Sequence, residues 1–173
     1  HAGFALLQAE PGSQVRLMKV QTLGPRDAHL DGTAVEVEAD AQGGALFCEL
    51  GGGQVVSGCN VALSGAGSRG SLETLYLGGD GRKQDFNYRL ELRGPGSEGE
   101  ISARGALAGT AKKTLKSTLD FIRGASGAKA REEETVLALS DRAVNLSTPL
   151  LLCGEANVEG AHAAGRTPKS STI

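Results

Sequence analysis

The stretch QDFNYRLELR, residues 84–93, carries the clearest secondary-structure signal in this sequence. Apolar and polar side chains alternate along its last eight residues with a period of two. The apolar positions are Phe86, Tyr88, Leu90 and Leu92. The polar positions are Asn87, Arg89, Glu91 and Arg93. Because successive side chains of a β-strand point to opposite faces, this alternation predicts a strand with one buried face.

Similar short runs recur on both sides of this strand, between breaks that are rich in glycine. The runs are AVEVEAD (34–40), ALFCEL (45–50), NVALS (60–64), SLETLYL (71–77), EISARGAL (100–107), TVLALS (135–140) and TPLLLC (148–153). Breaks such as GPGSEG come about every 10 residues, which is typical of all-β proteins. A sandwich, a barrel and a β-helix all fit this spacing.

Two features favour a β-helix among these three. The runs VLAL and LLL are apolar at successive positions, as in strands that are buried on both faces. Only Asp80-Gly81 matches the two-residue turn of a β-hairpin. No exact internal repeat is visible, so the pattern favours a β-helix without excluding the other two architectures.

Composition narrows the classes of function. The chain has 173 residues, of which 26 are glycine, and apolar residues make up 39%. So many glycines in a chain that is still this apolar suit many turns between short strands. A net charge of −2 argues against nucleic acid as a partner. No stretch approaches the roughly 20 apolar residues of a membrane span, so we expect no membrane partner. Three cysteines are too few for a disulfide scaffold and fit a reducing cytoplasm.

Two segments have patterns that fit either a helix or a strand. TAKKTLKSTLDFIRG, residues 110–124, places Leu115, Leu119 and Ile122 at helical spacing, although its β-branched residues and flanking glycines favour a strand. REEETVLALSDR, residues 131–142, begins with glutamates that suit a helix.

The break GAGSRG, residues 65–70, has the G-x-G-x-x-G spacing of a dinucleotide-binding loop, and Asp85 follows where a ribose-binding acid could lie. Such a loop must open a helix whose N-terminus holds the pyrophosphate. The next residues, SLETLYLGG, are too few before a double glycine to form that helix. We therefore interpret GAGSRG as a turn between strands.

Several titratable residues have ordinary structural interpretations. Cys48, Cys59 and Cys153 lie on apolar runs, where we expect them to pack in the core. His29 lies in the polar stretch RDAHLDG, where we expect it to be exposed. The lysines at 112, 113 and 116 predict a solvated strand face, and the glutamates at 132–134 predict a charged surface turn.

The segment CGEANVEGAHAAG, residues 153–165, places Cys153 and His162 nine residues apart. That spacing raises the question of a metal site. Small residues on both sides of His162 leave its imidazole uncrowded, and imidazole is a common metal ligand. A metal role and a structural role for His162 both stay open on the pattern alone.

DFIRGASGAKAREEETVLALSDRAVNLSTPLLLCGEANVEGAHAAG, residues 120–165, resembles the C-terminal part of the core of SufB/SufD family proteins, which belong to the Suf iron–sulfur cluster assembly machinery. The matching elements are LALSD, TPLLL and NVEGAHAA. Residues 60–92, NVALSGAGSRGSLETLYLGGDGRKQDFNYRLEL, also resemble the family's core.

The resemblance implies an all-β, right-handed parallel β-helix, and it implies that both ambiguous segments are strands. It covers residues 33–165. We expect residues 1–32 to be a partly irregular N-terminal lead-in. We expect residues 166–173, RTPKSSTI, to be an atypical or truncated tail, with the family's C-terminal helical segment missing.

The function that the resemblance implies is a non-enzymatic scaffold subunit. Such a subunit pairs with a SufB/SufD-type partner, as a homodimer or a heterodimer, and works in the cytoplasm with the SufC ATPase. His162 falls at the family's interface histidine, a possible iron ligand. We expect no cofactor to be stably bound by this chain alone, and a transient iron–sulfur cluster at a dimer interface.

Two departures from the family pattern place the chain closer to SufD, or to an undifferentiated SufB/SufD-type paralogue, than to SufB. The strand REEETVLALSDRA has no cysteine, and Ala163 follows His162 where SufB proteins have glutamate. Two other functions remain as alternatives. One is a secreted β-helix that binds or cleaves polysaccharide, and the other is a purely structural oligomerisation module.

Overall fold

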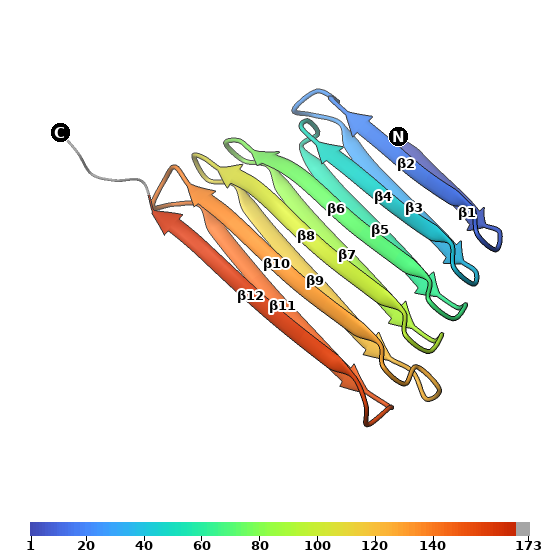
Figure 1. The fold of residues 1–173 in the computed structure, drawn as a ribbon. Coiled ribbons are helices and arrows are strands. Elements are labelled where there is room, and N and C mark those ends of the chain that lie inside the picture. Colours follow the sequence, from blue (N-terminus) through green and yellow to red (C-terminus); the bar gives the residue numbers. More distant parts are fainter. Residues whose placement is uncertain (169–173) are drawn as a thin grey trace.

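The computed structural model describes residues 1–168 as twelve β-strands in two sheets, with no helix (Figure 1). We call the first the odd sheet: β1 (Ala2–Ala9), β3 (Ala28–Val37), β5 (Gln54–Leu63), β7 (Lys83–Leu92), β9 (Lys112–Phe121) and β11 (Val144–Cys153). We call the second the even sheet: β2 (Gln14–Gln21), β4 (Gln42–Glu49), β6 (Arg69–Gly78), β8 (Glu98–Leu107), β10 (Lys129–Ala138) and β12 (Glu159–Pro168). The described residues therefore contain no helix that could cross a membrane.

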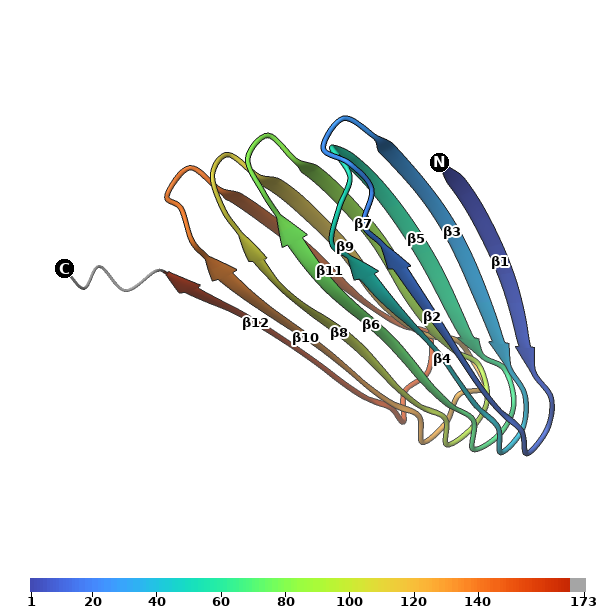
Figure 2. The same cartoon turned by 90° about the horizontal axis from the view of Figure 1, so that it is seen from above.

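The chain alternates between the two sheets, so each coil contributes one strand to each sheet (Figure 2). Every pairing within a sheet is parallel, for example β5 with β7 and β6 with β8. The coils advance in a right-handed sense, which is the usual sense for parallel crossovers. The fold is a parallel β-helix of about six coils, flattened into two layers, and this confirms the predicted architecture.

The strands stack in register although the coils differ in length. The step along the chain between paired residues varies from 26, between Leu30 and Val56, to 32, between Thr114 and Leu146. The differences are absorbed in the turns, because the paired strands match residue for residue. This variation explains why the sequence shows no exact repeat.

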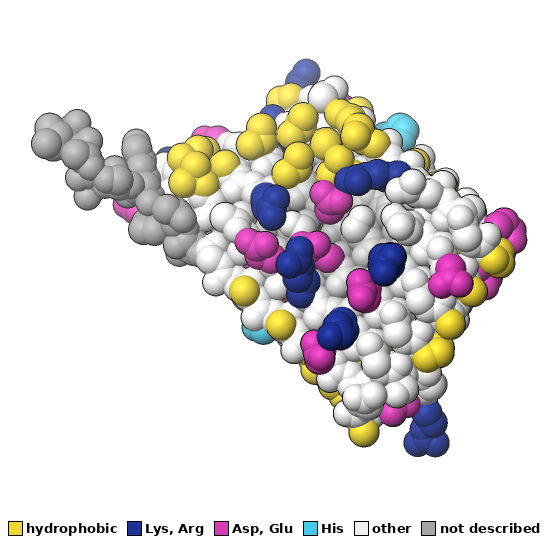
Figure 3. Space-filling view, in the orientation of Figure 1, with side chains coloured by type: hydrophobic (Ala, Val, Ile, Leu, Met, Phe, Trp, Pro, Cys, Tyr) yellow, Lys and Arg dark blue, Asp and Glu magenta, His cyan; other side chains and the backbone are white. Residues whose placement is uncertain are grey.

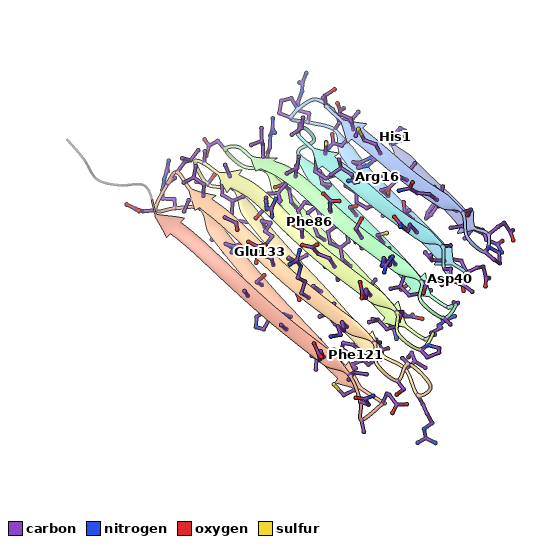
Figure 4. All side chains as sticks on the ribbon, in the orientation of Figure 1. His1, Arg16, Asp40, Phe86, Phe121 and Glu133 are labelled. Carbon is purple, nitrogen blue, oxygen red and sulfur yellow. The ribbon has the colours of Figure 1, made fainter. Side chains whose placement is uncertain are left out.

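Aromatic side chains fill the middle of the β-helix. Phe86 of β7 is fully buried between the sheets, with its ring centroid 5.5 Å from that of Tyr76 and 5.8 Å from that of Tyr88 (Figure 4). Phe47 extends the group, 5.9 Å from Tyr88. These residues come from both sheets, so they bind the two layers together by burying apolar surface.

At one corner of the β-helix, residues with positive φ, the left-handed backbone conformation, stack in a ladder from coil to coil. They occupy equivalent turns in successive coils: Gly12, Asp40, Gly67, Gly96 and Gly127. Each donates its backbone N–H to a carbonyl in the turn of the next coil, as Gly67 does to Pro95 and Gly96 to Ser126. Glycine suits this ladder because it adopts positive φ without steric cost.

The ambiguous segments form β9 and β10, so both are strands as the resemblance implied. GAGSRG is a turn that leads into β6, as predicted. The expectation of a lead-in at 1–32 does not match, because these residues form β1, β2 and the start of β3. The predicted tail overlaps the end of β12, and residues 169–173 lie outside the described part.

Candidate functional site

His162 lies on β12, in the last coil that the structure describes. Its register partner on β10 is Glu132, which faces the interior of the β-helix. Paired residues of parallel strands point to the same side of a sheet, so His162 also belongs to the interior row. No described coil stacks beyond β11 and β12, and His162 is therefore exposed at this end.

Glu132 occupies an unusual position for a carboxylate. Its side chain is almost fully buried, and the hydroxyl of Ser117 on β9 donates a hydrogen bond to its Oε1 atom. Burial raises the pKa of Glu132 because desolvation disfavours its charged form, while the Ser117 hydrogen bond and the nearby His162 oppose that rise. Glu132 therefore places a buried carboxylate next to the imidazole of His162 on the adjacent strand.

A second buried charge, Glu134, belongs to a complete ion-pair network. Lys113, which is only 1% exposed, donates to Glu134 and to Asn145 Oδ1 at 3.0 Å. The Ser147 hydroxyl also donates to Glu134, and the Lys113 ammonium lies 5.4 Å from the centroid of the Tyr76 ring. Burial lowers the pKa of Lys113, against the opposing effect of Glu134. Lys113 and Glu134 thus compensate each other's charge.

Two predictions about these charges are wrong. We expected Lys113 on a solvated face and Glu132–Glu134 in a surface turn, whereas Lys113, Glu132 and Glu134 are buried in strands. Only Glu133 of the acidic run faces solvent (Figure 4). Alternation places Glu132 and Glu134 on one strand face with Val136 and Ala138, but it does not by itself show that this face is the buried one.

The cysteines fit their predicted core positions in one case of three. Cys59 is buried, and burial raises the pKa of its thiol to about 12. Cys48 is only partly buried, because it lies on the outer face of β4. Cys153 is exposed, because its strand lies in the last described coil and nothing stacks on it.

Cys153 and His162 do not form a metal pair. Cys153 pairs in register with Phe121 of β9. His162 pairs in register with Glu132, and the carboxylate of Glu132 accepts a hydrogen bond from Ser117 of β9. Ser117 and Phe121 are four residues apart on β9, or about 13 Å along a strand. Among the described residues, no group of three or more His, Cys, Asp or Glu side chains could hold a metal ion. Glu132 and His162 can offer a metal one oxygen and one nitrogen ligand.

The opposite end of the β-helix carries a separate polar cluster. Lys19 donates to Asp31 at 2.8 Å and to Thr33 at 2.7 Å. His29 is only 8% exposed and lies 3.2 Å from the ring nitrogen of His1, so the expectation of an exposed His29 is wrong. Burial lowers the pKa of His29. The charge of Asp31 is compensated by Lys19.

The outer face of the even sheet is lined with charged side chains that also pair with one another (Figure 3). A shallow groove of about 850 Å³ crosses this face along a row of small residues that includes Gly43, Gly70 and Gly99. The ion pairs along it are Arg16–Glu73, Arg69–Glu98, Lys129–Glu159 and Arg131–Glu100. Exposed pairs of this kind contribute little to stability. Each described charged side chain that lines the groove belongs to one of these pairs.

The chain was compared with known proteins. The model of the SufBD core domain of the SUF system for FeS cluster assembly matches residues 1–167. The iron–sulfur cluster assembly protein SufD of Bacillus subtilis (strain 168) is 31% identical over 112 residues, which are 65% of this chain and 26% of SufD. The chain thus spans about a quarter of the length of that relative.

A malate dehydrogenase from Aliivibrio fischeri (strain MJ11) is also 31% identical, over 127 residues that make up 72% of this chain and 40% of that enzyme. A dinucleotide-binding fold requires helices that pack on a parallel sheet. The described residues have no helix, and the G-x-G-x-x-G segment leads into strand β6. This identity therefore gives no support for a dehydrogenase function.

Proposed function

Because the chain belongs to the SufBD core domain family of the SUF system, we propose that it serves as a non-enzymatic scaffold subunit in iron–sulfur cluster assembly. In this role it pairs with a SufB/SufD-type partner and works together with the SufC ATPase. The cluster, or the iron from which it is built, is the cargo of the assembly. The match over residues 1–167 is the observation that carries this proposal.

The position of His162 supports a role in handling that cargo. The imidazole is exposed at one end of the β-helix, where a partner can reach it, and it stands beside the buried carboxylate of Glu132. Imidazole and carboxylate are both suitable ligands for iron. The neighbouring Lys113–Glu134 pair is already satisfied, which leaves the exposed imidazole of His162 and the buried carboxylate of Glu132 as the candidate ligands of this row.

The same end also presents surface that suits pairing with another protein. β11 and β12 are the outermost strands of their sheets among the described residues. Leu150, Leu151 and Leu152 are 50%, 44% and 40% exposed. Among the described residues these strand edges are unpaired, and a partner that pairs with them would satisfy their backbone groups and bury the leucines.

Cell-based complementation tests the proposal. In cells that depend on this protein for cluster assembly, His162→Ala is expected to lower the activity of iron–sulfur enzymes, while the purified variant keeps the thermal stability of the parent protein. Glu159→Gln is the matched control, because it lies on the same strand and makes only an exposed ion pair with Lys129. Normal iron–sulfur enzyme activity with a well-folded His162→Ala protein would contradict a role of this end in assembly.

A further inference from the structure

A stacked pair of histidines lies at the end of the β-helix opposite to β12. His1 directly precedes β1, and His29 is the second residue of β3 (Figure 4). Ala2 pairs in register with Leu30, so His1 lies beside His29. The ring centroids are 5.2 Å apart, and the two Nδ1 atoms are 3.2 Å apart. Neither imidazole has a part in the proposed function.

The separation of these two nitrogens suits one metal ion. Zn²⁺ binds imidazole nitrogen at about 2.0–2.1 Å, so two such ligands in a tetrahedral site are about 3.3–3.4 Å apart. The observed 3.2 Å is close to this value, so neither ring has to move far to bind an ion. A hydrogen bond from one ring to the other fits the same distance, and an ion would replace the proton that the two nitrogens share.

Gly3 leaves space beside the histidine pair. It pairs in register with Asp31, and a Cβ added to it would lie 3.6 Å from Cε1 of His1 and 3.5 Å from Oδ1 of Asp31. The missing side chain leaves room for water molecules that complete the coordination of an ion. Asp31 already accepts hydrogen bonds from Lys19 and Thr33, so its carboxylate would orient such a water rather than bind the ion.

His29 and His1 are both suited to binding an ion. His29 is 8% exposed, and burial lowers its pKa, so the neutral imidazole, which is the form that binds metal, predominates at neutral pH. His1 is exposed, so an ion can reach the pair from solvent. Lys19 also acts on His29, but it is paired with Asp31 at 2.8 Å, which limits its repulsion of a bound cation.

We propose that His1 and His29 together bind one divalent ion of the Zn²⁺ class, which links β1 to β3 at this end of the β-helix. Imidazole nitrogen suits Zn²⁺, whereas Mg²⁺ and Ca²⁺ prefer oxygen ligands. The ion fastens a strand that packing holds weakly, because Ala9 is the only buried residue of β1. The inference is independent of the proposed function, because no residue of β12 takes part.

Titration of the whole 173-residue chain with Zn²⁺ tests the site, with calorimetry for the affinity and NMR of the imidazole rings for the location. We expect the His1 and His29 resonances to shift together, and His1→Gln and His29→Gln each to lower the affinity at least about tenfold. Saturating Zn²⁺ should also slow amide exchange in β1. Leu30→Gln is the matched control, because Leu30 follows His29 on β3 but faces outward, 45% exposed, and it should bind Zn²⁺ as the parent chain does.

His1→Gln keeps the test valid if His29→Gln folds poorly, because the side chain of His1 is exposed. Unshifted His1 and His29 resonances at millimolar Zn²⁺ would show a plain hydrogen bond and overturn the inference. A loss of affinity in His1→Gln with none in a folded His29→Gln would also overturn it, because the terminal amine and imidazole of His1 would then hold the ion alone. Equal losses in His29→Gln and Leu30→Gln would do the same. None of these results bears on the role of His162 in cluster assembly.

Discussion

Glu49 is a buried carboxyl group that no cation neutralises by direct contact among the described residues. It is 2% exposed, and its Oε2 atom has no hydrogen-bond partner. The hydroxyl oxygen of Ser57 is likewise buried without a partner. Burial raises the pKa of Glu49. A protonated Glu49 would be a hydrogen-bond donor, and a donor close to Ser57 would satisfy both oxygens.

We predict that Glu49→Gln stabilises the protein at neutral and alkaline pH. A carboxyl whose pKa is higher in the folded than in the unfolded state contributes stability at low pH and loses it as the pH rises through the folded value. Glutamine keeps the shape without this loss, and we expect a gain of about 1 kcal/mol above that range. Urea unfolding from pH 4 to 9 measures it. Glu10→Gln, at an exposed turn, is the control. Parallel stability curves for Glu49→Gln and the parent would contradict the prediction.

The pair Lys113–Glu134 gives a second prediction. Lys113→Met alone leaves Glu134 buried without its cation, so we expect a loss of about 3–5 kcal/mol in the free energy of unfolding. The double variant Lys113→Met/Glu134→Gln removes both charges and should recover most of that loss. Chemical denaturation of the two single variants and the double variant gives the coupling energy. Additive losses would show that the two groups do not compensate each other.

The charged interior residues mark the limit of what the sequence reveals at this scale. His162 is a candidate because of its small neighbours and the family resemblance, and its metal role stays a prediction. The burial of Glu132 and Lys113 was missed, because charged residues are rarely buried and a run of charged residues usually lies on a solvated surface. Their strand alternation was visible in the sequence, but alternation does not say which face is inside when one face carries Glu132 and Val136 and the other Glu133 and Leu137.

At the scale of elements, the strands were predictable and their corners only in part. The period of two in QDFNYRLELR identified β7 directly, whereas β9 needed the resemblance because Leu115 and Leu119 also suit a helix. The glycine-rich breaks correctly marked the turns. The left-handed ladder of the corner was hidden, because it includes Asp40, and because stacking between coils is not a local property of the chain.

Gly96 tests the corner ladder. Its φ is 64°, and a Cβ added there would meet no atom within 4 Å, so Gly96→Ala isolates the cost of the backbone conformation. We expect a loss of about 1–2 kcal/mol in the free energy of unfolding, measured by thermal or chemical denaturation. Gly79→Ala is the matched control, because a Cβ there meets only the flexible side chain of Arg82. An equal effect of both substitutions would contradict a specific role for the left-handed turn.

At the scale of the whole molecule, the fold class was predictable and its limits were not. Alternating runs and glycine breaks favoured a β-helix, and the resemblance specified its handedness. The boundary expected at residue 33 was wrong, because β1 and β2 continue the same stacking with shorter strands and exposed side chains such as Phe4 and Leu6. Coils of unequal length hide the repeat from sequence comparison within the chain, although the register between strands is unbroken.

Stacking of this kind predicts that stability decreases from the central coils to the ends, because each coil contacts only its neighbours. Phe86→Ala in the central coil removes a fully buried ring and should cost about 3–5 kcal/mol. Leu151→Ala, where the side chain is 44% exposed, should cost under about 1.5 kcal/mol. Native-state hydrogen exchange distinguishes the two effects: Phe86→Ala should speed exchange throughout β5–β9, whereas Leu151→Ala should speed it only in β11 and β12. Faster exchange of the central amides in Leu151→Ala would show that the β-helix unfolds as one unit.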